Sequence, residues 1–206
     1  MIKIEKHVVG ALESNSFLVI DDSKKQSLLI DAGGDYNTIK DKAAALGHPI
    51  GALLLTHGHF DHTADAFLAA DSGVKVYISE KDAFMLSSAQ NCLADNFGIR
   101  FEPCKTYNVI KEGDANICGF SLEVIATPGH TAGSVCYKIG EYLFCGDTVF
   151  KYGFGRYDLP TGDFGDLVRS FKKLKKYCGL KIFCGHGEDT DLDEEKKFNP
   201  LFIYEN

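Results

Sequence analysis

The chain has 206 residues, of which 45% are hydrophobic, and this is enough for one globular domain with a sizeable core. Its formal net charge of −7 gives no positive field that could hold a nucleic-acid backbone, so we expect no nucleic-acid partner. No apolar run approaches the length of a membrane span, so we expect no membrane partner either. We predict a single domain over residues 1–206.

The cysteines indicate the compartment. There are seven, an odd number without any Cys-x-x-Cys spacing, which favours neither a disulfide framework nor a structural zinc knuckle. The N-terminus alternates apolar and polar residues as a strand does, and it lacks the continuous apolar stretch of a signal peptide. A reducing compartment fits these features best, and we predict a cytoplasmic protein.

The first quarter of the chain predicts strands followed by a helix. Residues 2–9 and 17–20 favour a strand hairpin with its turn at 13–15, and residues 27–30 favour a third strand. Asp31 ends that strand, where it could either brace a neighbouring loop or serve as a turn or helix-capping residue. A helix is predicted over residues 36–46.

A dense group of metal-ligand side chains follows the next strand. The bulky apolar run at 51–55 suits a strand buried on both faces. His57, His59, Asp61 and His62 then fall within six consecutive positions. His57 and His59 are two residues apart and can point at a common centre, while Asp61 and His62 could face a second one. Imidazole together with carboxylate suits zinc, iron or manganese better than calcium or magnesium.

The middle of the chain predicts further alternation of helix and strand. A helix at 63–70 and a strand at 74–78 fit a βαβ unit with the preceding strand. Residues 81–89 favour another helix, and 91–104 a loop-rich insertion over the site. The remaining predicted elements are strands at 120–126, 135–139, 142–145 and 181–184, an amphipathic helix at 163–178, with Cys178 on its apolar face, and a solvated turn or frayed helix at 189–195.

More residues of ligand type stand where predicted strands end. His130, Asp147 and His186 each follow an apolar strand, as His57 does, and each has glycine beside it. Loops at strand ends are where an α/β scaffold builds its sites, and glycine lets the backbone approach a crowded centre. We therefore expect these residues to join the histidine cluster. Cys145 and Cys184 precede Asp147 and His186 by two residues, and they favour small apolar core positions over a place near the metals.

These motifs resemble the metallo-β-lactamase superfamily over about residues 15–190. The resemblance implies an α/β fold, the αββα four-layer sandwich, with the site at one edge of the two sheets. Asp31 stands where the family has its first conserved aspartate. The motifs that carry the resemblance are His57-x-His59-x-Asp61-His62, His130 after Thr127-Pro128-Gly129, Asp147 in Gly146-Asp147-Thr148, and His186 in Gly185-His186-Gly187.

Carried over by position, the resemblance implies two divalent metal ions, for which we expect zinc, with iron or manganese as alternatives. Within the superfamily the chain looks most like short hydrolases of the glyoxalase II type, the hydroxyacylglutathione hydrolases. Residues 155–163 resemble the segment that follows the bridging aspartate in that group. One metal would be held by His57, His59 and His130, the second by Asp61, His62 and His186, and Asp147 would bridge both.

The expected activity is hydrolysis of a small-molecule thioester such as a hydroxyacyl-glutathione. Two metals would share a bridging hydroxide that attacks the carbonyl, and the leaving thiolate needs no proton. Asp61 is the candidate catalytic residue that orients this nucleophile. Arg156 could contact a substrate carboxylate, because guanidinium pairs bidentately with carboxylates, and Tyr157 and Lys151 are further candidates.

Other activities reuse the same residues. Persulfide dioxygenases share these motifs but use one iron, which His57, His130 and Asp147 would hold with positions open for oxygen and substrate. Lactonases and β-lactamases use the same centre for other hydrolyses, and the acidic charge disfavours a nuclease. The number of metals per chain separates a binuclear hydrolase from the dioxygenase.

Overall fold

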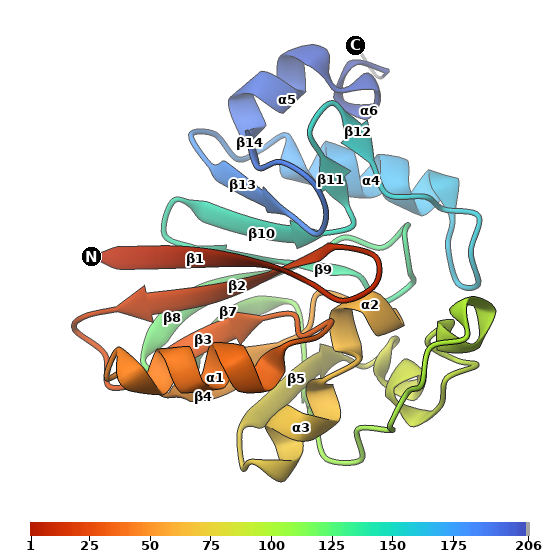
Figure 1. Ribbon diagram of the computed structural model, residues 1–206. Helices are drawn as coiled ribbons and strands as arrows, with labels where there is room; N and C mark the ends of the chain where they lie inside the picture. Colours follow the sequence, from red (N-terminus) through yellow and green to blue (C-terminus); the bar gives the residue numbers. More distant parts are fainter. Residues whose placement is uncertain (205–206) are drawn as a thin grey trace.

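A computed structural model describes residues 1–204 and shows two six-stranded sheets packed face to face with helices on both outer sides (Figure 1). Helices α1 and α3 cover the first sheet at the bottom of the view, and α4, α5 and α6 cover the second at the top. This arrangement confirms the predicted αββα sandwich. Whether residues 1–206 form one domain stays a prediction.

The first sheet has the strand order β1-β2-β3-β4-β5-β6. β1 pairs antiparallel with β2 and β2 with β3, and the later pairs are parallel. The parallel β4 and β5 confirm the predicted βαβ unit. The strands of this sheet and the helices and turns between them are β1 (Ile2–Val9), β2 (Ser14–Asp21), β3 (Ser27–Ile30), α1 (Tyr36–Ala45), β4 (Ile50–Leu54), α2 (Phe60–Thr63), α3 (Ala66–Asp71), β5 (Lys75–Ser79), the 3₁₀ turns η1 (Ala83–Ser87) and η2 (Ala94–Phe97), and β6 (Asn108–Ile110).

The second sheet has the order β14-β13-β10-β9-β8-β7, and a small hairpin of β11 and β12 lies beside it. β9 and β10 form the predicted hairpin, and β13 runs parallel to β10. The elements are β7 (Gly113–Ile117), β8 (Phe120–Ala126), β9 (Val135–Ile139), β10 (Tyr142–Gly146), β11 (Val149–Phe150), β12 (Gly153–Phe154), α4 (Phe164–Leu174), β13 (Lys181–Cys184), β14 (Thr190–Asp191), α5 (Leu192–Phe198) and α6 (Pro200–Ile203).

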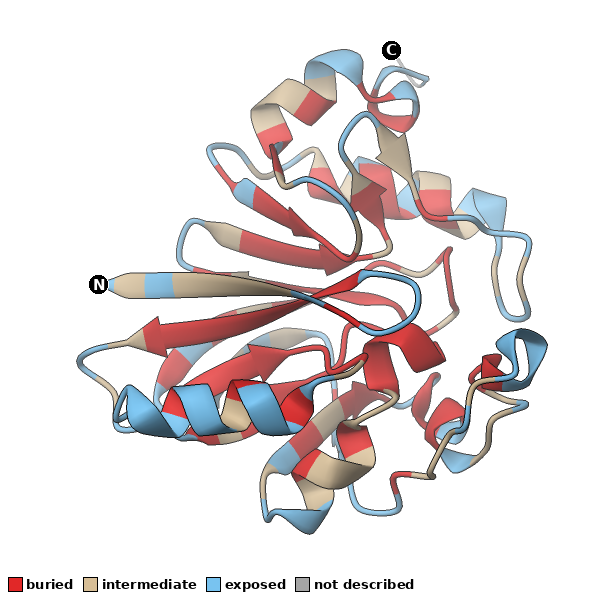
Figure 2. Cartoon of the chain, in the orientation of Figure 1, coloured by how far each residue is buried: buried red, intermediate tan, exposed pale blue. Residues whose placement is uncertain are grey.

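Alternating side chains along the strands produce the layers. In β2, Phe17 and Val19 pack between the two sheets, while Leu18 and Ile20 pack against the helices outside. Successive side chains of a strand point to opposite faces, so a continuous apolar run fills two layers at once. Figure 2 shows the result as buried strands through the middle of both sheets.

Several predicted boundaries were wrong. Residues 81–89 form only the 3₁₀ turn η1, because the Ser87 hydroxyl bonds to the Phe84 carbonyl and the Ser88 hydroxyl accepts from the Asn91 N–H, which favours turns over helix. The helix predicted at 63–70 does not begin at Thr63: α2 ends at that residue, and α3 begins at Ala66. The first turn precedes Ser14, so residues 14 and 15 belong to β2.

The C-terminal third also differs from expectation. Helix α4 ends at Leu174, so Cys178 lies beyond its apolar face and is exposed. The segment at 189–195 is ordered as β14 and the start of α5, and Glu195 is fully buried. Its carboxylate accepts hydrogen bonds from the Thr190 hydroxyl and the Asn199 amide, which account for its burial.

None of the helices within residues 1–204 combines the length and the apolar character that crossing a membrane requires.

Candidate metal centre

The ends of several strands meet at one edge of the sandwich. β10 and β13 run parallel, and β8 has the same direction because β9 is antiparallel to both of its neighbours. The loops after these strands therefore lie at the same edge of the second sheet, and they meet the loop that follows β4 in the first sheet. The structure brings together all seven predicted residues in three overlapping groups, with ligand atoms within 4.8 Å of one another: His57, His59 and His130; His57, His62 and Asp147; and Asp61, His62 and His186.

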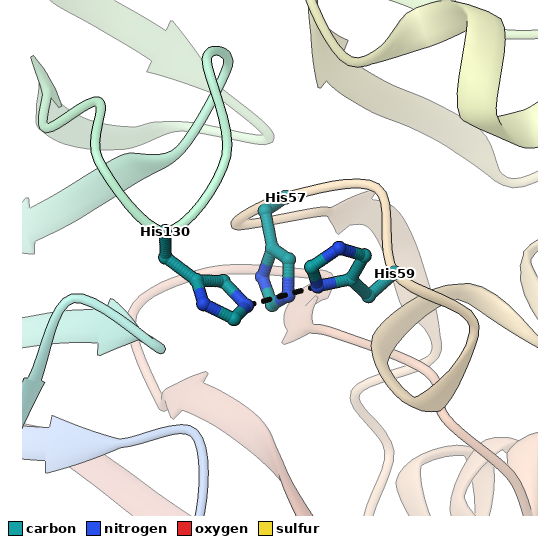
Figure 3. A group of neighbouring side chains, drawn as sticks. All are labelled: His57, His59 and His130. Atoms are coloured by element: carbon teal, nitrogen blue, oxygen red, sulfur yellow. Dashed lines mark hydrogen bonds between the residues drawn. The ribbon is translucent and has the colours of Figure 1, made fainter. Parts of the chain in front are cut away.

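The first group is made of three histidines from two loops. Figure 3 shows the rings of His57 and His59, from the loop between β4 and α2, converging with His130 from the loop after β8. Nδ1 of His59 lies 2.9 Å from Nε2 of His130. Nε2 of His57 is buried and has no hydrogen-bond partner within residues 1–204. A buried nitrogen without a partner is costly, and a cation among the three rings would satisfy it.

Backbone carbonyls hold the outer nitrogen of two histidines. Nδ1 of His130 donates to the Arg156 carbonyl at 2.7 Å, and Nδ1 of His186 donates to the Leu12 carbonyl at 3.1 Å. Because a carbonyl can only accept, the proton resides on Nδ1 and the unprotonated Nε2 of the neutral ring faces the cluster. Metal-binding histidines are oriented in this way.

Asp31 orients two further rings, His62 directly and His57 through Thr56. Its Oδ2 lies 2.8 Å from Nδ1 of His62 and accepts from the Thr56 hydroxyl at 2.8 Å, while its Oδ1 accepts from the Thr56 N–H at 2.8 Å. Since the Thr56 hydroxyl donates to Asp31, it accepts from Nδ1 of His57, 3.1 Å away. The bracing interpretation of Asp31 is confirmed. Its φ of 59° is a left-handed conformation that the surrounding bonds maintain.

The charges of the site favour a bound cation. Burial, followed by the positive charge of His130, lowers the pKa of His59 to about 3, and burial lowers the pKa of His57 well below its ordinary value. Burial opposes ionisation of Asp147, but the imidazoles, His62 foremost, hold the pKa of this carboxyl well below its usual range. Neutral imidazoles and ionised carboxylates are the forms that bind metals.

His62 shows the same attraction for positive charge. Burial lowers its pKa, but the carboxylates of Asp147, Asp61 and Asp31 outweigh burial and raise the pKa well above the ordinary value. The carboxylates of Asp61 and Asp147, which lie near Nε2 of His62, would therefore also stabilise a cation bound there. Histidine nitrogen and carboxylate oxygen are donors that suit zinc, iron and manganese, so the residues present fit such ions.

Close backbone approach explains the glycines around Asp147. A Cβ on Gly185 would lie 2.1 Å from Asp147 Oδ1, and a Cβ on Gly155 would lie 1.8 Å from the Asp147 carbonyl oxygen. Real Cβ atoms do not approach other atoms so closely, so glycine is required at both positions. Cys145 and Cys184, in contrast, pack with Leu167 in the core outside the second sheet, which confirms their assignment as apolar core residues.

A cavity of about 460 Å³ opens over the metal groups. Its wall is largely apolar. Leu93, Asn96 and Phe97 line it, so part of the segment at 91–104 lies over the site as predicted. Sequence reasoning missed the apolar side chains Leu12, Phe150 and Leu159. They lie in loops or a two-residue strand, where no periodicity marks them. The residues around the cavity are Leu12, His59, Phe60, Asp61, Leu93, Asn96, Phe97, His130, Asp147, Phe150, Arg156, Leu159 and His186.

The three predicted substrate residues are placed differently from one another. Arg156 lines the cavity, with its exposed guanidinium paired to both oxygens of Asp158 at 2.8 and 2.9 Å. Within the described chain, Tyr157 and Lys151 are not part of the cavity wall: Tyr157 contacts the Phe164 ring, and Lys151 pairs with Glu188. Of the three, only Arg156 is placed to meet a ligand there.

Sequence reasoning also missed polar residues that hold the ligand loops. The Ser14 hydroxyl donates to the Asp61 carbonyl at 2.5 Å, and the Asn15 amide donates to the carbonyls of Cys184 and Gly187 at 2.8 and 3.1 Å. Both residues begin β2, although they had been predicted as part of the turn before it. Their only signal was their place before an apolar strand, which does not reveal contacts made 47 and 169 residues away.

Comparisons with known proteins agree with this geometry. Residues 9–186 match the metallo-beta-lactamase superfamily. Hydroxyacylglutathione hydrolase GloC of Haemophilus influenzae is 35% identical over 211 residues, covering 97% of this chain and 98% of GloC. The BLEG-1 B3 metallo-beta-lactamase has a TM-score of 0.90 at 28% identity, covering 97% and 99% of the two chains. TTHA1623, solved in a di-iron-bound form, has a TM-score of 0.85 at 30% identity, covering 96% and 99%. The chain therefore belongs to the metallo-β-lactamase superfamily, as a metallo-hydrolase.

Proposed function

We propose that this metallo-hydrolase holds two divalent cations, zinc in the first instance, and hydrolyses thioesters of the hydroxyacyl-glutathione kind. The observation that carries the proposal is the position of Asp147. Its Oδ1 lies 3.2 Å from Nε2 of His62, and its Oδ2 lies 3.6 Å from Nε2 of both His130 and His186. One carboxylate thus stands between the three-histidine group and the group of Asp61, His62 and His186, where a bridging ligand belongs.

The relatives support two ions but leave their identity open. TTHA1623 was solved with two irons, and the donors of this chain also suit iron and manganese. GloC supports the thioester, since it is a hydroxyacylglutathione hydrolase that aligns over nearly the whole chain. All seven cysteines are free within residues 1–204. Because free thiols are typical of a reducing compartment, we propose a cytoplasmic location.

Two divalent cations at this place would supply a hydroxide nucleophile at neutral pH and a Lewis acid for the charge that develops on the carbonyl oxygen. Asp61 lines the cavity, and its Oδ2 lies 3.1 Å from Nε2 of His186. This carboxylate can accept a hydrogen bond from the nucleophile and orient it. A thiolate leaving group, with a parent pKa near 8.5, departs without protonation, so no general acid is required.

The side chains that line the cavity indicate which chemical groups of a substrate would fit there. Leu12, Phe97 and Phe150 offer apolar surface for the acyl chain and the carbon atoms of the thiol part, while Arg156 at the wall can pair with a carboxylate. A small molecule that combines apolar carbon with a carboxylate group fits this lining. We propose such a molecule as the partner of the chain.

Metal analysis and activity measured on the same purified sample test the proposal. We expect close to two metal ions per chain, hydrolysis of S-lactoylglutathione, and loss of hydrolysis after a chelator removes the metals. About one iron per chain, with oxygen uptake in the presence of a persulfide, would instead establish the mononuclear dioxygenase. Two metals with hydrolysis of a lactone or β-lactam and none of the thioester would refute the proposed substrate.

A further inference from the structure

A second buried carboxylate lies beside the metal centre without belonging to it. Asp82, directly before η1, is fully buried. Its Oδ2 accepts from the Gly58 N–H at 3.0 Å and from the Thr131 hydroxyl at 2.6 Å, and its Oδ1 accepts from the Gly133 N–H at 2.8 Å. Burying a carboxylate is costly unless it is hydrogen-bonded, and three donors around one side chain offset that cost.

These donors belong to the two loops that carry the three-histidine group. Gly58 lies between His57 and His59, and Thr131 follows His130 directly. The donors are 24, 49 and 51 residues away from Asp82 in the sequence, so the contacts fix loops that would otherwise be positioned independently. The Asp82 side chain therefore holds both loops next to the histidines of this group.

Ser79, at the end of β5, makes a further contact with the loop that carries His130. The Ser79 hydroxyl donates to the Gly133 carbonyl at 2.6 Å, so Gly133 is held at both its N–H and its carbonyl. A Cβ on Gly133 would lie 2.3 Å from Asp82 Oδ1 and 2.3 Å from the Ser79 hydroxyl. On the other loop, a Cβ on Gly58 would lie 2.5 Å from Met85 Sδ. Both loops press directly on residues 79–85.

We propose that Asp82 is a positioning residue that sets the distance and orientation between the two loops of the three-histidine metal group. The inference rests on the proposed metal centre and adds to it a residue that touches neither the metal nor the substrate. Partners that orient metal ligands typically contribute about 10- to 100-fold to metal affinity. Oδ2 joins the two loops, because it accepts from Gly58 of the first and Thr131 of the second, and Oδ1 adds a further contact to the second loop through Gly133.

The variant Asp82→Asn tests this role. An amide has only one oxygen, and in the orientation that loses least this oxygen takes the place of Oδ2 and keeps the bonds to Gly58 and Thr131. Its N–H₂ group then faces the Gly133 N–H, so the second loop loses one acceptor and is held less firmly. We expect one of the two zinc sites to bind about 10- to 100-fold more weakly, measured by competition with a chromophoric chelator on the zinc-loaded full chain. The other site should keep its affinity.

Further variants separate positioning from general destabilisation. Thr131→Val removes one donor while keeping the shape of the side chain, and we expect a zinc affinity about 10-fold lower at the same site. Thr131→Ser keeps the hydroxyl and should restore wild-type affinity. Glu195→Gln is the matched control, because Glu195 is an equally buried, hydrogen-bonded carboxylate whose partners include Thr190 and Asn199 rather than the histidine loops. It should lower the melting temperature of the metal-free protein and leave both zinc affinities unchanged.

The outcomes distinguish this inference from the proposed function. If the wild-type chain binds two zinc ions and Asp82→Asn and Thr131→Val bind both as tightly, the positioning role is refuted and the metal centre stands. Equal loss of zinc affinity in Glu195→Gln would likewise refute it, because the effect would then be one of stability. A wild-type chain that binds no metal would refute the metal centre and, with it, the role of Asp82.

Discussion

The variant Asp31→Asn tests how the metal centre is built. Oδ2 of Asp31 meets both His62 Nδ1 and the Thr56 hydroxyl, and Oδ1 meets the Thr56 N–H, each at 2.8 Å. Asparagine keeps the shape and tolerates the left-handed backbone at this position. Its amide oxygen can replace only one of the two carboxylate oxygens. The orientation that loses least places the oxygen at Oδ2 and leaves the Thr56 N–H facing an N–H₂ group.

The magnitude follows from these contacts. An unsatisfied buried donor costs about 1–3 kcal/mol, so the unfolding free energy of the metal-free protein should fall by about that amount. His62 also loses its charged acceptor, which should weaken metal binding by about 10- to 100-fold, or about 1.4–2.7 kcal/mol. The two effects are measured separately, by urea denaturation after chelator treatment and by zinc competition.

A control and a contrary result make the test decisive. Asp65→Asn changes a partly buried aspartate that accepts from the Tyr36 N–H at 3.0 Å and holds no histidine ring. It should leave zinc affinity unchanged. If Asp31→Asn unfolds at the same urea concentration as the wild type and binds zinc equally tightly, the network around Asp31 does not support the site.

Three further predictions concern the ligands, the cavity and the thiols. Asp147→Ala and His59→Ala should each lower kcat/KM for thioester hydrolysis by more than about 100-fold with an unchanged circular dichroism spectrum, and retained activity in either would contradict the two-metal assignment. Phe97→Ala should raise KM by about tenfold at constant kcat, because the ring offers uniform binding surface in the cavity wall; an unchanged KM would place the substrate elsewhere. In native protein at pH 8, iodoacetamide should modify the exposed Cys178 and spare Cys92, whose pKa burial raises to about 11, as mass spectrometry would show; equal labelling of both would contradict the packing.

Many strands and the cluster of ligands were predictable because both depend on short-range spacing, whereas the four-layer sandwich was implied by the resemblance to the superfamily. The apolar run at 51–55 was predicted to be buried on both faces, and Leu53 and Leu54 do pack into different layers. His57 and His59 share a centre, as expected of residues two apart on an extended segment. His130 and His186 could be added because each follows an apolar strand. Such features are local in the sequence and need no knowledge of distant contacts.

The supporting contacts could not be predicted, because they depend on which loops meet in space. Asp82 and Glu195 look like surface carboxylates in the sequence, yet both are fully buried by partners that the fold supplies. Part of the cavity wall gave no signal either, since Leu12 and Leu159 lie in loops and Phe150 in a strand of two residues. Strand β6 was missed because it is short and its Val109 side chain faces solvent.

Anomalous diffraction from crystals of the zinc-loaded protein tests the central claim most directly. We predict two zinc peaks, one among His57, His59 and His130 and one among Asp61, His62 and His186, with a carboxylate oxygen of Asp147 between them. A single peak with the second group empty, in protein that hydrolyses the thioester at full rate, would contradict the binuclear account.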